Sequence, residues 1–188
     1  TDRFLAEMSR LTGIGTDDPD ALADAAGPAS AFLRASLRTT ANATGLGAGY
    51  KHNVIPDRAE ALIDVRVLPG TEEAALADIR RIVGDGIEIE TVVRDVGLET
   101  TFEGDLVDRM VEALARHDPD APVIPYLLGA GTDNKALSRL GITGYGFAPL
   151  RLPPGMDFTG MFHGVDERVP IDALVFGQRV LTDFLRTC

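Results

Sequence analysis

The spacing of apolar residues predicts a helix at the start of the chain and a strand soon after it. Residues 2–11 carry apolar side chains three and four positions apart, as in a helix that buries one side, and Gly13 ends this pattern. The polar residues 12–30 predict a loop with a short helical piece. Residues 32–44 then predict a strand.

Residues 53–70 show the clearest strand pattern, because apolar and polar residues alternate along them. Successive side chains of a strand face opposite sides of the sheet. One side would carry Ala61, Ile63, Val65 and Val67. The other side would carry Glu60, Leu62, Asp64 and Arg66.

A helix is predicted over residues 71–83, after the strand ends at Pro69 and Gly70. Thr71 can cap this helix, and the acidic residues of its first turn suit the helix dipole. Its buried stripe would consist of Leu76, Ile79, Ile82 and Val83. Residues 86–93 alternate again and predict another strand.

The pattern changes near residue 100. Residues 104–117 predict an amphipathic helix, and the short apolar runs 121–128 and 142–150 are typical of strands buried on both faces. Between these runs, the Gly-rich residues 129–141 predict a loop leading into a helix. A Pro-rich loop follows at 151–157, and a final helix over 172–185 would bury Phe176, Val180 and Phe184.

These elements predict two kinds of fold in one chain. The first hundred residues indicate part of an α+β sandwich, in which helices cover one face of an antiparallel sheet that is short of a strand. The later alternation of helices and buried strands indicates an α/β fold. We therefore place a domain boundary near residue 100, which separates residues 1–100 from residues 101–188.

Composition narrows the classes of partner. The 188 residues are 45% hydrophobic and 25% charged, as in an ordinary globular protein. A net charge of −11 argues against nucleic acid or an anionic membrane, and no apolar run approaches the roughly 18 residues that span a bilayer. The single cysteine, Cys188, fits a reducing compartment such as the cytoplasm. The amino terminus shows no signal-peptide pattern, and it reads as though cut from a longer chain.

His163 is the first candidate for chemistry, in the loop FHGVDE at residues 162–167. It follows a buried strand and a Pro-rich loop, and α/β sheets carry their sites in loops at the carboxyl ends of strands. It could be a metal ligand, or a polar contact that closes a turn. The acids Asp166 and Glu167 could cap the next helix or pair with Arg168.

Two further stretches could bind an anion. In GAGTDN at residues 129–134, Thr132 and Asp133 lie where a helix amino terminus would present N–H groups to an anion, although a simple turn capped by Thr132 or Asp133 explains the pattern equally well. Asn53 starts the alternating strand, and Arg66 lies opposite its apolar stripe. An arginine fork suits a substrate carboxylate, whereas the alternative is a solvated arginine on the sheet face.

Other catalytic patterns are absent from the sequence. It contains no Gly-x-Ser-x-Gly elbow, Walker loop, Gly-x-Gly-x-x-Gly fingerprint or paired cysteines. Cys188 is terminal, which argues against a nucleophile. Glu72 and Glu73 resemble a catalytic pair, but they belong to the first turn of a predicted helix.

Three stretches, taken in their order and spacing, resemble the carboxyl-terminal half of M20 zinc metallopeptidases, a family of carboxypeptidases, aminoacylases and deacylases. These stretches are residues 47–70, 129–150 and 161–181, and the resemblance extends from about residue 35 to the end. It implies an α/β catalytic domain that holds two zinc ions, with an inserted α+β lid domain that forms homodimers. Residues 1–100 would be a partial lid, and residues 101–188 the closing piece of the catalytic domain.

The resemblance also implies roles for single residues. His163 would bind one zinc ion, although one histidine does not distinguish zinc from cobalt or manganese. Asn53 and Arg66 would hold the substrate's carboxylate or stabilise its transition state, often across the dimer. Gly131 and Thr132 would line the substrate site.

The remaining family motifs are not found in these 188 residues. They are a His-x-Asp motif, a Glu-Glu pair that supplies the general base, a further ligand and a lid histidine, all expected before Thr1. We therefore expect a fragment of a hydrolase that cleaves the amide bond of small peptides or N-acyl amino acids, inactive by itself. The alternative is a non-catalytic module that dimerises or binds a ligand.

Overall fold

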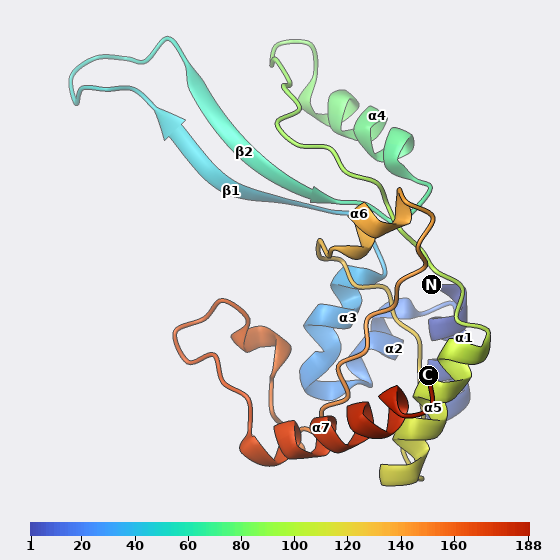
Figure 1. Ribbon diagram of the computed structural model, residues 1–188. Helices are drawn as coiled ribbons and strands as arrows, with labels where there is room; N and C mark the ends of the chain where they lie inside the picture. Colours follow the sequence, from blue (N-terminus) through green and yellow to red (C-terminus); the bar gives the residue numbers. More distant parts are fainter. The chain divides into compact units, whose positions relative to one another are not determined.

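The computed structural model describes residues 1–188, which form two compact units (Figure 1). Residues 1–37 and 99–188 make the first unit, here called the helical unit. Residues 38–98 make the second, called the hairpin unit. The chain thus leaves the helical unit, forms the hairpin unit and returns at Glu99. Residues 1–37, which we assigned to the lid, pack within the helical unit, and the functional division at residue 100 stays a prediction.

Three short helices begin the helical unit. The first is α1 (Asp2–Thr12), which ends at Gly13, where a φ of 76° favours glycine. The second, α2 (Pro19–Asp24), begins where the Asp18 side chain accepts a hydrogen bond from the Ala21 N–H. A 3₁₀ turn, η1 (Gly27–Ala29), leads into α3 (Ser30–Ser36). Phe4, Met8 and Leu22 form the buried core of these helices.

The strand predicted over residues 32–44 is wrong in its first half. Residues 32–36 belong to α3, and Leu33 packs against the core around Phe4 and Leu22. A helix forms here because it places Leu33 against that core. This is a tertiary contact that the local sequence pattern does not reveal. The strand itself begins at Thr40.

An antiparallel pair of strands, β1 (Thr40–Ala48) and β2 (Ala59–Arg66), forms the sheet of the hairpin unit. The register runs from Thr40 opposite Arg66 to Ala48 opposite Ala59, with a bulge between Ala43 and Gly45. Helix α4 (Glu72–Val83) follows β2, as predicted, with two glutamates in its first turn. The strand and the helix expected over 53–83 are therefore confirmed, with β2 shorter than its sequence pattern.

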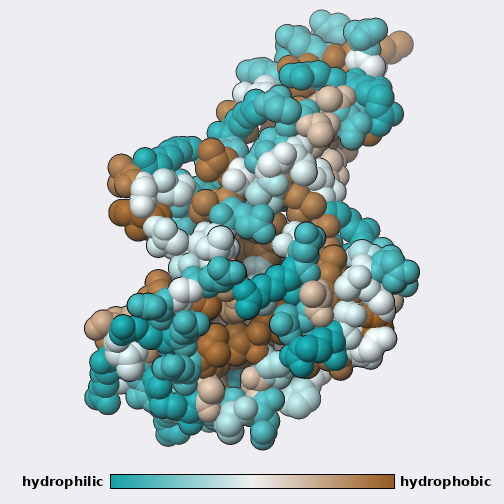
Figure 2. Space-filling model, turned by 90° about the vertical axis from the view of Figure 1, so that its right-hand side faces the viewer, coloured by the Kyte–Doolittle hydropathy of each residue, from teal (hydrophilic) through white to brown (hydrophobic).

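The hairpin unit buries less apolar surface than we expected. Helix α4 has no buried residue, and Ile82 of its expected stripe is 73% exposed. Residues 86–93 are not a strand, since an extended segment becomes one only by pairing, and these residues pair with no other segment. Apolar side chains therefore lie open among polar ones on the surface, in brown in Figure 2.

Two long helices form the second core of the helical unit. They are α5 (Asp105–His117) and α7 (Ile171–Leu185), and their buried residues include Ala113, Phe176 and Val180. Phe184 is half-buried and makes an edge-to-face contact with Phe147 at 5.5 Å between ring centroids. The predicted burial of one side of the final helix is thus confirmed.

The buried strands predicted at residues 121–128 and 142–150 are not formed. Both runs are irregular, and Tyr126 and Ile142 are 55% and 49% exposed. The elements between α5 and α7 are the short helix α6 (Asn134–Ser138) and the 3₁₀ turn η2 (Thr159–Met161). The helical unit is therefore mostly helical, and the α/β sheet predicted for this region is absent from it. No helix of the chain has the length and apolar character needed to cross a membrane.

Candidate functional site

The loop around His163 is a tight turn that exposes the imidazole. His163 has a φ of 60°, which is uncommon for a residue other than glycine. Its backbone N–H donates a hydrogen bond to Oε2 of Glu167 at 3.1 Å, and the Gly164 N–H donates to the Met161 carbonyl at 2.9 Å. Glu167 therefore holds the backbone of the loop and leaves the side chain of His163 in solvent.

The acids beside His163 play different parts from those considered in the sequence. Arg168 donates from Nη1 to the backbone carbonyl of Asp166 at 2.9 Å, and neither acidic side chain pairs with it. Helix α7 begins after Pro170, so neither Asp166 nor Glu167 caps it. Glu167 instead positions the turn that presents His163.

The chain by itself does not assemble a zinc site. A catalytic zinc ion needs about three protein ligands. No group of three or more histidine, cysteine, aspartate or glutamate side chains comes close enough to hold a metal ion. His163 is thus a single candidate ligand, and the other ligands implied by the resemblance are not among these residues.

Gly131 and Thr132 lie in an exposed turn that leads into α6. The Thr132 carbonyl accepts a hydrogen bond from the Lys135 N–H at 3.1 Å, and the Asp133 side chain makes no capping bond. The loop-to-helix transition predicted here is confirmed. Helix α6 has only five residues, so its dipole offers little attraction to an anion.

Asn53 and Arg66 both belong to the hairpin unit, but the hairpin holds them far apart. Asn53 lies in the exposed loop that joins β1 to β2, whereas Arg66 is the last residue of β2. The eight residues of β2 extend over roughly 23 Å at about 3.3 Å per residue. Arg66 donates from Nη2 to Oδ2 of Asp64 at 2.6 Å, on the polar side of the strand.

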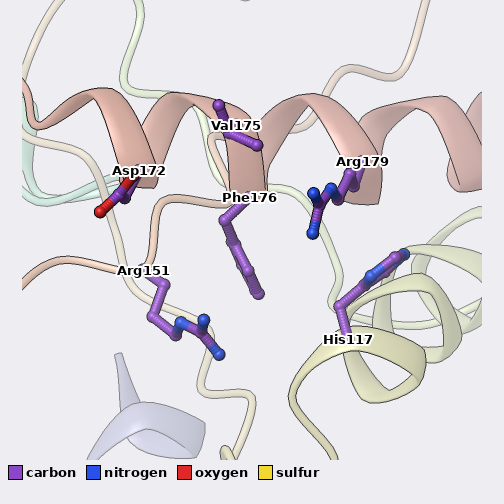
Figure 3. Close-up of a pocket in the computed structure, with 6 residues that line it drawn as sticks. All are labelled: His117, Arg151, Asp172, Val175, Phe176 and Arg179. Atoms are coloured by element: carbon purple, nitrogen blue, oxygen red, sulfur yellow. The ribbon is translucent and has the colours of Figure 1, made fainter.

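One pocket of the helical unit was not foreseen from the sequence. Its volume is about 330 Å³, and His117, Arg151, Asp172, Val175, Phe176 and Arg179 line it (Figure 3). These residues come from α5, α7 and the segment before η2, so no local sequence motif predicts the pocket. The one usable signal was Phe176, which the helical spacing predicted to face inward.

Comparison with known proteins identifies a known domain within the chain. Residues 3–88 match the peptidase dimerisation domain of the M20 type. The chain contains an M20 dimerisation domain. That match includes both strands of the hairpin, all of α4, the helices α2 and α3, and all of α1 except its first residue.

The chain is also a distant homologue of curated M20 proteins. It is 30% identical to the probable carboxypeptidase S-like 2 of Dictyostelium discoideum over 144 residues, which cover 74% of this chain and 27% of that protein. It is 27% identical to human aminoacylase-1 over 159 residues, 81% of this chain and 38% of that protein. The N-fatty-acyl-amino acid synthase/hydrolase PM20D1 of Mus musculus is 30% identical over 82% of this chain and 32% of that protein.

This chain therefore spans only about a quarter to two fifths of the length of these relatives. No solved structure matches it. The likeness of the chain to M20 proteins therefore rests on sequence.

Proposed function

We propose that this chain serves an M20-type amidohydrolase, in which the hairpin unit is the dimerising lid. The observation that carries the proposal is the hairpin of β1 and β2 inside the segment that matches the dimerisation domain. Its apolar face is open: Leu46 is 83% exposed and Ile63 is 46% exposed. Burial of such a face against a second copy would remove apolar surface from water and favour a homodimer.

The separation of Asn53 and Arg66 supports an arrangement shared between two subunits. A loop residue and a residue at the opposite end of β2 cannot both contact one small carboxylate within a single hairpin. Asn53, at the exposed loop, would reach the substrate of a partner subunit. Arg66 would release its ion pair with Asp64 and would form a bidentate hydrogen bond to the carboxylate of the substrate.

The proposed substrates are small peptides or N-acyl amino acids, and the proposed metal is zinc, with cobalt or manganese as alternatives. These follow from the M20 relationship and from the names of the relatives, which include an aminoacylase and an N-fatty-acyl-amino acid synthase/hydrolase. His163 would be one metal ligand, presented by the turn that Glu167 holds. The other ligands and the general base would come from polypeptide outside these residues, and Gly131 and Thr132 would line the substrate site.

A chimeric enzyme tests the proposal. This chain would replace the matching segment of the Dictyostelium carboxypeptidase S-like protein, and the purified chimera would be assayed on N-acyl amino acids and dipeptides, with bound zinc measured by elemental analysis. We expect hydrolysis and bound zinc, both reduced at least about tenfold by His163→Asn. The control is Val165→Ala, in the same loop, whose side chain is fully exposed and which should keep both properties.

The result separates the two candidate functions. A folded chimera that keeps its zinc and activity after His163→Asn would contradict the role of His163. A folded, dimeric chimera without hydrolysis would favour the alternative, a non-catalytic dimerising or ligand-binding module. The pocket of the helical unit is the observation that favours that alternative.

A further inference from the structure

The pocket between α5 and α7 brings two arginines to one aromatic ring. The Arg151 guanidinium lies over the ring of Phe176, with Cζ 4.9 Å from the ring centroid. Arg179 projects from α7 three residues after Phe176, on the same side of the helix. Figure 3 shows the Phe176 ring between the two guanidinium groups, with His117 beyond Arg179.

These arginines are available to a ligand. Neither the Arg151 nor the Arg179 guanidinium forms a hydrogen bond or a salt bridge to another residue, in a chain of net charge −11. His117 is already engaged, because its Nε2 lies 2.6 Å from Oδ2 of Asp183 on α7. A guanidinium group is stabilised by a bidentate hydrogen bond to an oxyanion. Neither guanidinium group of this pocket has such a contact within the chain, so each can bind the oxyanion of a ligand.

The net charge of the residues that line the pocket indicates the charge of the anion that would bind there. Asp172 is the one acidic residue of the lining, so two arginines against one aspartate leave a single net positive charge. Figure 3 shows Asp172 at the end of the pocket away from Arg179. A singly charged group balances this lining, and Phe176 with Val175 supplies an apolar wall for the rest of a ligand.

We propose that this pocket binds a small organic carboxylate, with its carboxylate between Arg151 and Arg179 and its apolar body against Phe176 and Val175. The volume of about 330 Å³ lies at the lower end of the range for small-molecule sites. The pocket contains none of the residues assigned to amide hydrolysis. The inference therefore goes beyond the proposed function and does not depend on it.

The test is an NMR titration of the 188-residue chain, labelled with ¹⁵N, against three probes. Phenylacetate carries both features of the proposed ligand, inorganic phosphate carries only the anion, and benzyl alcohol carries only the ring. We expect phenylacetate to shift the backbone resonances of Arg151, Phe176 and Arg179 with a Kd of about 1 mM or tighter. The other two probes should bind at least about tenfold more weakly. Phosphate that binds as tightly as phenylacetate, or phenylacetate that leaves these resonances unmoved, overturns the proposal.

Variants locate the binding. Arg151→Gln and Arg179→Gln should each weaken phenylacetate at least about tenfold, because each removes a charge-assisted contact. The matched control is Arg186→Gln at the end of α7, outside the pocket, which should change the Kd by less than about twofold. If a glutamine variant unfolds by circular dichroism, Arg179→Lys decides: it keeps the charge and loses the fork, so binding should weaken. Folded variants that bind as the unchanged chain does overturn the assignment.

Discussion

Glu72, the first residue of α4, is held by backbone N–H groups. Its own N–H lowers the pKa of its carboxyl below the ordinary value of 4.5, and the backbone of Gly70 and Gly97 and the Arg94 guanidinium act in the same direction. The Gly97 N–H donates to Oε1 of Glu72 at 3.1 Å. This side chain therefore ties the start of α4 to a segment 25 residues later.

We expect the Glu72 carboxyl to titrate with a midpoint below 4.5 in the folded chain. Because the folded-state pKa is the lower one, the ionised carboxylate stabilises the fold above the unfolded-state pKa. That stabilisation is lost as the pH falls through the folded-state pKa. Carbon-detected NMR of the carboxyl gives the midpoint, and the stability difference between the chain and Glu72→Gln should shrink in acid. A midpoint at or above 4.5 contradicts the hydrogen-bond pattern around α4.

Single residues were predicted well where local geometry decides. Gly13 as a helix stop, and Glu72 with Glu73 in a first helical turn, follow from rules that act within a few residues, and both were correct. The turn at His163 depends on a positive φ that the residue type does not specify. The pairing of Arg66 with Asp64 depends on side-chain rotamers, although the strand pattern places both residues on one side of the sheet. The roles of Asn53, Arg66, Gly131, Thr132 and His163 in a substrate site stay predictions.

Helix α7 packs closely against the backbone of residues 149–150. Gly177 lies on its buried side, and a Cβ added there would approach the Pro149 carbonyl oxygen to 2.7 Å and Leu150 Cδ2 to 3.4 Å. Glycine is therefore required at this point of the helix by the backbone of residues 149–150.

Gly177→Ala should destabilise the helical unit by about 1–3 kcal/mol because of this overlap. The sign is informative, since alanine in place of glycine within an exposed helix stabilises by about 1 kcal/mol. Urea unfolding followed by circular dichroism measures the change. The neighbouring exposed substitution Gln178→Ala is the control and should shift stability by less than about 0.5 kcal/mol. A Gly177→Ala chain as stable as the original would contradict the packing of α7.

Helices could be predicted from the sequence more completely than strands. Helix hydrogen bonds close within four residues, so the spacing of apolar residues identified α1, α4, α5 and α7. A strand needs a partner elsewhere in the chain. The pattern of residues 86–93, 121–128 and 142–150 suits strands, but no segment of this chain pairs with them. The pocket of the helical unit was missed for a similar reason, since its lining comes from separate elements.

At the scale of the whole molecule, the chain combines a helical unit that has two buried cores with a hairpin unit that has no buried residue. A two-stranded sheet is at best marginally stable in water without further packing. The open apolar face and the unpaired strand edges of the hairpin unit are surfaces that favour association. The match to an M20 dimerisation domain includes both strands of this unit, which supports the proposal that the partner is a second copy of the chain.

The most direct measurement is therefore the mass of the 188-residue chain in solution by sedimentation velocity over a range of concentrations. We predict a dimer of about 40 kDa, twice the 20.0 kDa of one chain. Ile63→Asp, on the apolar face of β2, should shift the equilibrium toward the monomer, whereas Ile171→Asp, which is 77% exposed in the helical unit, should leave the dimer intact. A chain of about 20 kDa at every concentration, or a dimer indifferent to Ile63→Asp, would contradict the assignment of the hairpin unit as the dimerising lid.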